Sequence, residues 1–207
     1  MSVKVKICGL RRAEDILSVN SHRPDYAGFI LTQGFRRSVT AEDFKELVSQ
    51  LDKGIKSVGV FVNEPIESVR DSFAPYLDVI QLHGDEEDGY ISQLREFFKG
   101  EIWKAVRAKT AADIEAADRL SAHRLLIDSF VEGVAGGTGK IADTAVIKAA
   151  EFSKPFLLAG GIDENNAVTL AKELRPFGLD ISSSVETDGF KDDDKIRRII
   201  SLIKEET

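Results

Sequence analysis

The chain has 207 residues, of which 43% are hydrophobic and 30% charged, and its formal net charge is -7 at pH 7. These totals supply enough apolar side chains for a full core and argue against disorder, while the acidic balance argues against nucleic acid as a partner. A single cysteine excludes an internal disulfide, and no stretch reaches the roughly 18 apolar residues of a membrane span. We therefore expect a cytoplasmic protein without a membrane partner.

Short runs rich in β-branched residues alternate along the chain with amphipathic segments of helical periodicity. The runs predict strands at residues 3–8, 26–31, 56–62, 79–83, 101–106, 124–128, 155–159 and 178–182. The segments predict helices at residues 13–21, 41–52, 66–76, 89–98, 111–120, 144–150, 165–174 and 192–206. No Pro/Gly-rich linker or low-complexity segment interrupts this alternation, so we expect one domain over residues 1–207.

Eight strand–helix units in a chain of this length are typical of a single-domain α/β protein with the closed (β/α)₈ TIM-barrel fold. The rival is a doubly wound open sheet, which would usually carry a G-x-G-x-x-G loop after its first strand. The segment ICGLRRAED has no such loop. We therefore predict the barrel, with its chemistry at the carboxyl ends of the strands.

The first predicted strand ends at Cys8, and strand alternation places Lys6 and Cys8 together on the face that lines the barrel. At a spacing of about 7 Å along a strand, the Lys6 cation would lower the pKa of the Cys8 thiol toward the range of a general base. Taken in isolation, a lone thiol is more often a small packing group. The strand-end position is what favours chemistry.

The sixth predicted strand ends at Asp128, across the barrel mouth from the first. Asp128 would either cap the following turn or, sheltered in the mouth, donate a proton to a substrate. His83 ends the fourth strand and is as consistent with a satisfied hydrogen bond as with a part in the site. Because the three histidines are scattered and lack metal-ligand spacing, we predict no metal and no organic cofactor.

Loops rich in glycine or serine follow the last three predicted strands: GVAGGTGK (133–140), AGGIDENN (159–166) and SSSVETDG (182–189). Glycines allow backbone N–H groups to approach an anion, and barrels often bind phosphate after strands seven and eight. The loop after the second strand carries Arg36 and Arg37. A guanidinium there would suit a substrate carboxylate, although an Arg-Arg pair is more commonly a solvated basic pair. These loops predict a small phosphorylated ligand.

The strand ends also occur as an ordered set of motifs from residue 5 to about 192: VKICGL, GFIL…RRSVT, VGVFVNE, VIQLHGDE, IWKAV, LLIDS, GGTGK, LAGGID-NN and RPFGLDISSSVE with GFKD after it. In this order they resemble the phosphoribosylanthranilate isomerase family, (β/α)₈ enzymes of tryptophan biosynthesis. The resemblance implies an Amadori rearrangement of N-(5′-phosphoribosyl)anthranilate to 1-(2-carboxyphenylamino)-1-deoxyribulose 5-phosphate.

The family's motifs, carried over position by position, imply a role for each site residue. Cys8 would be the general base, Asp128 the general acid, Arg37 the ligand of the anthranilate carboxylate, and Asp180 a neighbour of the anthranilate amine. His83 is grouped with the substrate-binding residues. The implied phosphate ligands are Gly137, Thr138, Gly139, Gly160, Gly161, Ser183 and Ser184.

Three features depart from the family's pattern, and the first is the IADT segment (141–144), where the family usually has phenylalanine and tryptophan around an Asp. Ser184 stands where the family has glycine. If that position needs a positive φ, serine there would weaken or reorient the binding of the phosphate. The GFRR loop leaves open whether Arg36 or Arg37 reaches the carboxylate. Two other functions remain as alternatives, another sugar-phosphate isomerase or epimerase and a non-catalytic phosphate-ligand binding barrel. The sequence also leaves open whether the protein is a monomer or a homodimer.

Overall fold

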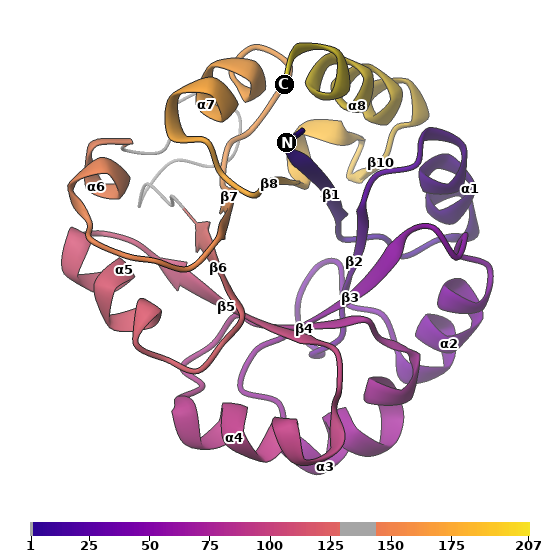
Figure 1. The fold of residues 1–207 in the computed structure, drawn as a ribbon. Helices are drawn as coiled ribbons and strands as arrows, with labels where there is room; N and C mark the ends of the chain where they lie inside the picture. Colours follow the sequence, from indigo (N-terminus) through magenta and orange to yellow (C-terminus); the bar gives the residue numbers. More distant parts are fainter. Residues whose placement is uncertain (1, 129–143) are drawn as a thin grey trace.

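Eight parallel strands close into a barrel, and the helices form a ring around it, as seen along the barrel in Figure 1. The structure is a computed structural model and describes residues 2–128 and 144–207. Each strand pairs with the next in chain order, and the eighth pairs with the first. The strands are β1 (Lys4–Cys8), β2 (Tyr26–Ile30), β3 (Lys56–Phe61), β4 (Val79–Leu82), β5 (Glu101–Arg107), β6 (Arg124–Asp128), β7 (Phe156–Ala159) and β8 (Gly178–Ile181).

This architecture confirms the predicted (β/α)₈ barrel, and the predicted strands lie within one residue of the observed bounds. The helices are α1 (Ala13–His22), α2 (Ala41–Ser49), α3 (Ile66–Ser68), α4 (Asp88–Phe97), α5 (Ala111–Asp118), α6 (Thr144–Ala149), α7 (Ala167–Leu174) and α8 (Asp193–Glu206). Side-chain caps begin two of them, since Thr40 accepts from the Asp43 amide and Asp192 accepts from the Lys195 amide. None of the helices within 2–128 and 144–207 is long and apolar enough to cross a membrane.

The segment 66–76 is not the single amphipathic helix that the sequence predicted. Only α3 is α-helical there, and it continues as a π-helical turn over Val69–Phe73 and a 3₁₀ turn over Ala74–Tyr76. Pro75 has no N–H to donate to a preceding carbonyl, so the α-helical ladder cannot continue through it. The irregular turns also bury Val69 and Phe73 in the layer between the helices and the barrel.

Strand alternation divides the apolar side chains into two cores. The larger core lies between strands and helices and includes Val5 and Ile7 of β1, both fully buried. The smaller core fills the barrel interior, where the rings of Tyr26 and Trp103 pack edge to face at 4.9 Å. Small residues also point inward, and this leaves room for polar groups at the carboxyl ends.

Gly28 on β2 shows why one inward position must be small. A Cβ atom there would lie 2.9 Å from Cys8 Sγ and 3.0 Å from Lys6 Cε, closer than side-chain atoms pack. The glycine therefore creates the space in which the Lys6 and Cys8 side chains lie inside the barrel. Lys6 is fully buried, and its ammonium donates to Asp180 Oδ1 at 2.9 Å across the β1–β8 pair.

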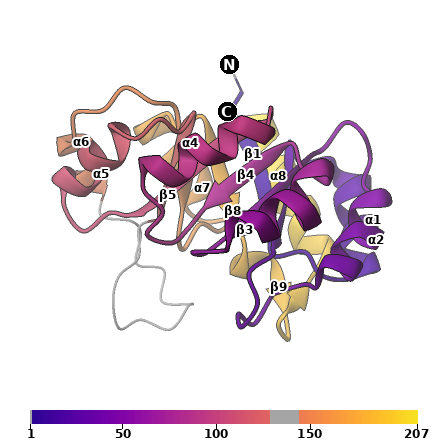
Figure 2. The ribbon, with the colours of Figure 1, turned by 90° about the horizontal axis from the view of Figure 1, so that it is seen from below.

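A two-stranded hairpin of β9 (Glu186–Thr187) and β10 (Phe190–Lys191) follows the barrel strands and was not predicted. Figure 2 shows it at the opposite end of the barrel from the C terminus. Its turn is formed by Asp188 and Gly189, both with positive φ, as a two-residue type I′ turn requires. The Asp-Gly dipeptide was thus a sequence signal for this hairpin.

Candidate active site

A cavity of about 240 Å³ opens at the carboxyl ends of the barrel strands. It brings together eight of the predicted site residues, which come from separate strands or strand-end loops: Cys8, Arg37, His83, Asp128, Asp180, Gly160, Gly161 and Ser183. The remaining residues that line it are Ile30, Val60, Gln81, Ala159, Ile162 and Ser182.

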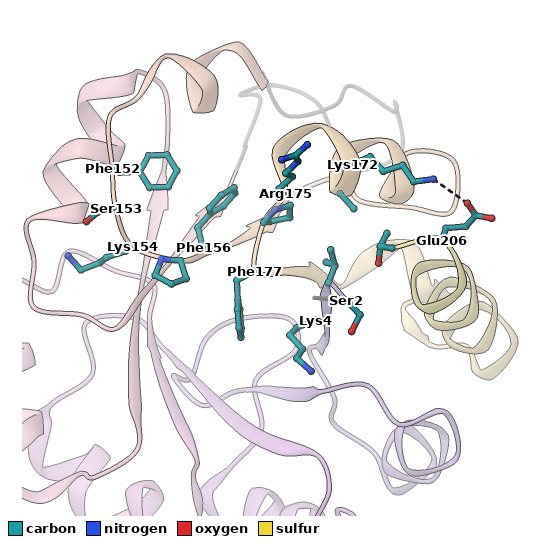
Figure 3. A pocket seen from close by; sticks show the side chains of 15 residues that line it. Ser2, Lys4, Phe152, Ser153, Lys154, Phe156, Lys172, Arg175, Phe177 and Glu206 are labelled. Carbon is teal, nitrogen blue, oxygen red and sulfur yellow. Dashed lines mark hydrogen bonds and ion pairs between the residues drawn. The ribbon is translucent and has the colours of Figure 1, made fainter.

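A larger hollow of about 1000 Å³ lies at the other end of the barrel, near the amino ends of β1, β7 and β8 (Figure 3). Phe152, Phe156 and Phe177 line it, and the Lys172 ammonium at its edge is paired with Glu206 at 3.2 Å. It contains none of the predicted site residues. Because barrel enzymes place their chemistry at the carboxyl ends of strands, the smaller cavity is the candidate site.

Cys8 lies at the end of β1 and is 7% exposed. Burial raises the pKa of its thiol, because the thiolate loses its solvation, and the Lys6 cation opposes this rise without overcoming it. Lys6 therefore acts in the predicted direction, but the predicted net lowering of the thiol pKa is wrong for the protein without ligand. One reason is that the Lys6 charge is already paired with Asp180, whose own charge raises the thiol pKa.

Asp128 ends β6 and faces His83, whose Nε2 lies 3.6 Å from Asp128 Oδ2. Both side chains are about one-fifth exposed, so each is open to the cavity. His83 Nδ1 lies 3.0 Å from the Gln81 carboxamide nitrogen, so the ring does have the hydrogen-bonding partner that one interpretation anticipated. Capping of the turn that follows Asp128 would involve residues 129 and 130, which lie outside the described residues.

Arg37 and Arg36 both bind one carboxylate, that of Glu186 on β9. Arg37 donates from Nε at 2.6 Å and from Nη2 at 3.2 Å, and Arg36 donates from Nη2 at 2.8 Å. Lys191 adds a third cation, with its Nζ 3.1 Å from Glu186 Oε1. Only Arg37 of these two arginines lines the cavity, and its side chain is 19% exposed against 55% for Arg36.

Glu186 is the main residue of the site region that sequence reasoning missed. Burial raises the pKa of its carboxyl, but the hydrogen bonds from Arg37 and Arg36 outweigh this effect and hold the pKa at about 2. The carboxylate is thus charged at all ordinary pH values and keeps the arginine pair at the cavity's edge. The Asp-Gly turn of the hairpin was the available signal, since it pairs Glu186 with Lys191.

The candidate phosphate loops are only partly described by the structure. Gly160 and Gly161 have positive φ, and together with Ser183 they line the cavity. Ser184 does not have positive φ, so serine fits where the family has glycine, and its buried hydroxyl has no hydrogen-bond partner in the described part of the chain. Gly137, Thr138 and Gly139 lie outside the described residues. Within 2–128 and 144–207, no His, Cys, Asp and Glu side chains form a group of three or more suited to a metal.

A closed eight-stranded parallel barrel with a polar cavity at its carboxyl ends defines a (β/α)₈-barrel enzyme. Residues 5–202 match the family model described as N-(5′-phosphoribosyl)anthranilate (PRA) isomerase. The N-(5′-phosphoribosyl)anthranilate isomerase of Thermoanaerobacter pseudethanolicus is 42% identical over 203 residues, which cover 98% of each chain. This chain belongs to the N-(5′-phosphoribosyl)anthranilate isomerase family and is an isomerase of tryptophan biosynthesis.

Solved structures of the family share the whole fold. A phosphoribosylanthranilate isomerase in complex with reduced 1-(o-carboxyphenylamino)-1-deoxyribulose 5-phosphate is 30% identical, with a TM-score of 0.84, and the match covers 98% of this chain and 99% of the other. Monomers generated from the dimeric enzyme of Thermotoga maritima are 31% identical, with a TM-score of 0.82 and the same coverage.

Proposed function

We propose that this barrel, as one domain over residues 1–207, converts N-(5′-phosphoribosyl)anthranilate to 1-(2-carboxyphenylamino)-1-deoxyribulose 5-phosphate by an Amadori rearrangement. The observation that carries the proposal is the meeting of a thiol, a carboxyl and an arginine in one cavity beside positive-φ glycines. The ligand of the related structure, a reduced form of the proposed product, supports the same substrate class. The single cysteine favours a reducing compartment, the cytoplasm, as the site of action.

In the first step, we assign Asp128 as the general acid. Its proton goes to the furanose ring oxygen while the C1′–O bond breaks, and the anthranilate nitrogen lone pair forms the C=N bond of an iminium. Asp128 is suited to this role because it ends a strand, lines the cavity and is only partly exposed. Proton transfer by a positioned group contributes about 10²–10⁴ to a rate.

In the second step, we assign Cys8 as the general base that removes the proton from C2′. The C–H electron pair forms the C1′–C2′ double bond of an enolamine, and the iminium nitrogen regains its lone pair. The raised pKa of the unliganded thiol is compatible with this role, because the iminium formed in the first step brings a cation beside it. Tautomerisation of the enolamine then gives the ketone.

Three further groups hold the substrate in this assignment. Arg37 binds the anthranilate carboxylate through the end of its guanidinium, since Glu186 already occupies the Nε and Nη2 side. Asp180, held by Lys6, accepts from the anthranilate amine. The phosphate ligands are assigned as Gly137, Thr138, Gly139, Gly160, Gly161, Ser183 and Ser184.

Turnover of N-(5′-phosphoribosyl)anthranilate, followed by the decay of its anthranilate fluorescence, tests the proposal. We expect the signal to decay with the purified chain and to stay constant without it. Tight binding of the reduced product analogue without any decay would instead support a non-catalytic phosphate-ligand barrel. Conversion of other sugar phosphates with no activity on this substrate would support a different isomerase or epimerase.

A further inference from the structure

Gln81, His83 and Asp128 form a line of polar side chains along one wall of the cavity. Gln81 lies on β4 two residues before His83, so both side chains point into the barrel. The Gln81 carboxamide nitrogen lies 3.0 Å from His83 Nδ1, and His83 Nε2 lies 3.6 Å from Asp128 Oδ2. The imidazole therefore stands between a carboxamide and the proposed acid.

The Gln81 contact determines which ring nitrogen of His83 carries the proton. A neutral imidazole has one N–H donor and one acceptor nitrogen. When the carboxamide N–H donates to Nδ1, that nitrogen must be the acceptor, so the ring proton lies on Nε2. The Nε2–H group then faces the Asp128 carboxyl, at a distance slightly longer than a hydrogen bond.

A glutamine at position 81 also destabilises the fold. It is 1% exposed, and its carboxamide oxygen has no hydrogen-bond partner in the described residues. A buried acceptor without a partner destabilises a protein, and a methionine of similar size would not bring such an acceptor into the barrel. Among the described residues with such unpaired buried side-chain atoms, only Gln81 lines the cavity. Its hydrogen bond to His83 is what sets it apart from a packing residue.

We propose that Gln81 is a positioning residue that holds His83 in the Nε2–H tautomer and so presents a hydrogen-bond donor to Asp128. This inference rests on the proposed function, in which Asp128 gives its proton to the furanose oxygen and becomes a carboxylate. The His83 N–H then donates a hydrogen bond to that carboxylate and stabilises the charge as it develops. No proton leaves His83 in this step.

The direct test is ¹⁵N NMR of the imidazole nitrogens, in the intact protein and in Gln81→Met. In the wild type we expect Nδ1 to give the signal of an unprotonated nitrogen and Nε2 that of a protonated one. In Gln81→Met both tautomers should be populated, and in Gln81→Glu, whose carboxylate accepts from Nδ1–H, the assignment should reverse. A wild-type ring protonated on Nδ1 would overturn the inference.

Kinetics and unfolding separate positioning from a structural role. Gln81→Met should lower kcat about 10- to 100-fold while KM changes little, since Gln81 acts through His83 on the acid step. The same variant should unfold at a similar temperature, because it removes the unpaired buried oxygen together with the hydrogen bond to His83. Gln93→Met is the matched control, on the exposed side of α4, and should change neither kcat nor the His83 signals. Unchanged kcat in a Gln81→Met variant whose tautomers are mixed would also overturn the inference.

The NMR result does not depend on turnover, so the two proposals can fail separately. If the protein does not consume N-(5′-phosphoribosyl)anthranilate, the proposed function fails while the tautomer measurement still stands. If Gln81→Met does not fold, Gln81→Leu replaces it in the same measurements, and the wild-type spectrum still shows which nitrogen of His83 carries the proton.

Discussion

At the scale of single residues, the Cys8 thiol shows how burial and charge compete. It has an ammonium nearby, yet burial in the barrel keeps its pKa above the ordinary value of a thiol. Asp128, more open to solvent, contacts a histidine instead. In the proposed mechanism, Cys8 accepts a proton once the iminium cation lies beside it, and Asp128 gives its proton to the ring oxygen. The two proposed roles therefore rest on different environments within one cavity.

Replacing either proposed catalytic group should abolish most turnover without loss of binding. We expect Cys8→Ala and Asp128→Asn each to lower kcat by about 10²–10⁴, the contribution of general acid–base catalysis. Fluorescence decay gives kcat, and titration with the reduced product analogue gives its affinity, which should change little. Near-normal kcat in Cys8→Ala would remove Cys8 as the base.

The role of Lys6 is testable through the thiol itself. Lys6→Met should raise the pKa of Cys8 further, because the cation that opposes the effect of burial is lost. The pH dependence of the rate of thiol alkylation measures this shift. Since Lys6→Met alone strands the Asp180 carboxylate, the double variant Lys6→Met/Asp180→Asn is the control for destabilisation. An unchanged thiol pKa in both variants would exclude Lys6 as the group that tunes Cys8.

The two arginines of the second loop should differ in their effect on substrate binding. Arg37 lines the cavity and Arg36 does not, so Arg37→Ala should raise KM about 10- to 100-fold, the value of a hydrogen bond to a charged group. Arg36→Ala should raise it much less. Steady-state kinetics gives KM for both variants. A larger rise in KM for Arg36→Ala than for Arg37→Ala would assign the substrate carboxylate to Arg36.

At the scale of elements, the β9–β10 hairpin joins the cavity's edge to the barrel through the Glu186 carboxylate. Its pKa falls from an ordinary 4.5 to about 2 in the folded protein. A lowered folded-state pKa means that the ionised carboxylate stabilises the fold above its unfolded-state pKa. That contribution is lost as the pH falls through the folded value.

Acid unfolding measures this contribution. Between pH 4.5 and 2, the wild type should lose unfolding free energy that is attributable to Glu186, because the carboxylate that the arginines hold at a pKa of about 2 becomes progressively protonated. Glu186→Gln should be less stable at neutral pH and should lose less stability over this interval. Urea unfolding at a series of pH values gives both curves, and parallel curves would contradict the assignment.

At the scale of the whole molecule, two hollows lie at opposite ends of one barrel, and only the smaller one carries the proposed chemistry. The larger one has aromatic walls and an arginine, Arg175, at its edge. Size alone therefore does not identify the site. Strand direction does, because inward-facing polar residues at the carboxyl ends meet in one place.

Ligand-induced stabilisation distinguishes the two hollows. The reduced product analogue at about 100 times its Kd should add about 2.7 kcal/mol to the unfolding free energy, a rise of several degrees in Tm. Arg37→Ala should diminish this rise, whereas Arg175→Ala, in the larger hollow, should retain it. Thermal unfolding with and without the analogue gives the comparison. Loss of the rise in Arg175→Ala alone would place the ligand at the wrong end of the barrel.

The sequence by itself determined the order and kind of most elements, the closed barrel and the positions of Cys8 and Asp128 at strand ends. The elements follow from local periodicity, which a strand or helix expresses through neighbouring residues alone, and the barrel follows from the number of strand–helix units. The irregular turns after α3 escaped prediction because their form depends on Pro75 together with burial of Val69 and Phe73.

Only the tertiary structure decided the electrostatics of the site. The hydrogen bonds between Arg37 and Glu186 join residues 149 positions apart in the chain. The net shift of the Cys8 pKa depends on how completely the closed barrel excludes water from the thiol. Likewise, the approach of Asp128 to His83 depends on how β6 lies relative to β4 in the closed barrel. Desolvation and pairing across the barrel are sums over distant segments, so no local pattern in the sequence encodes them.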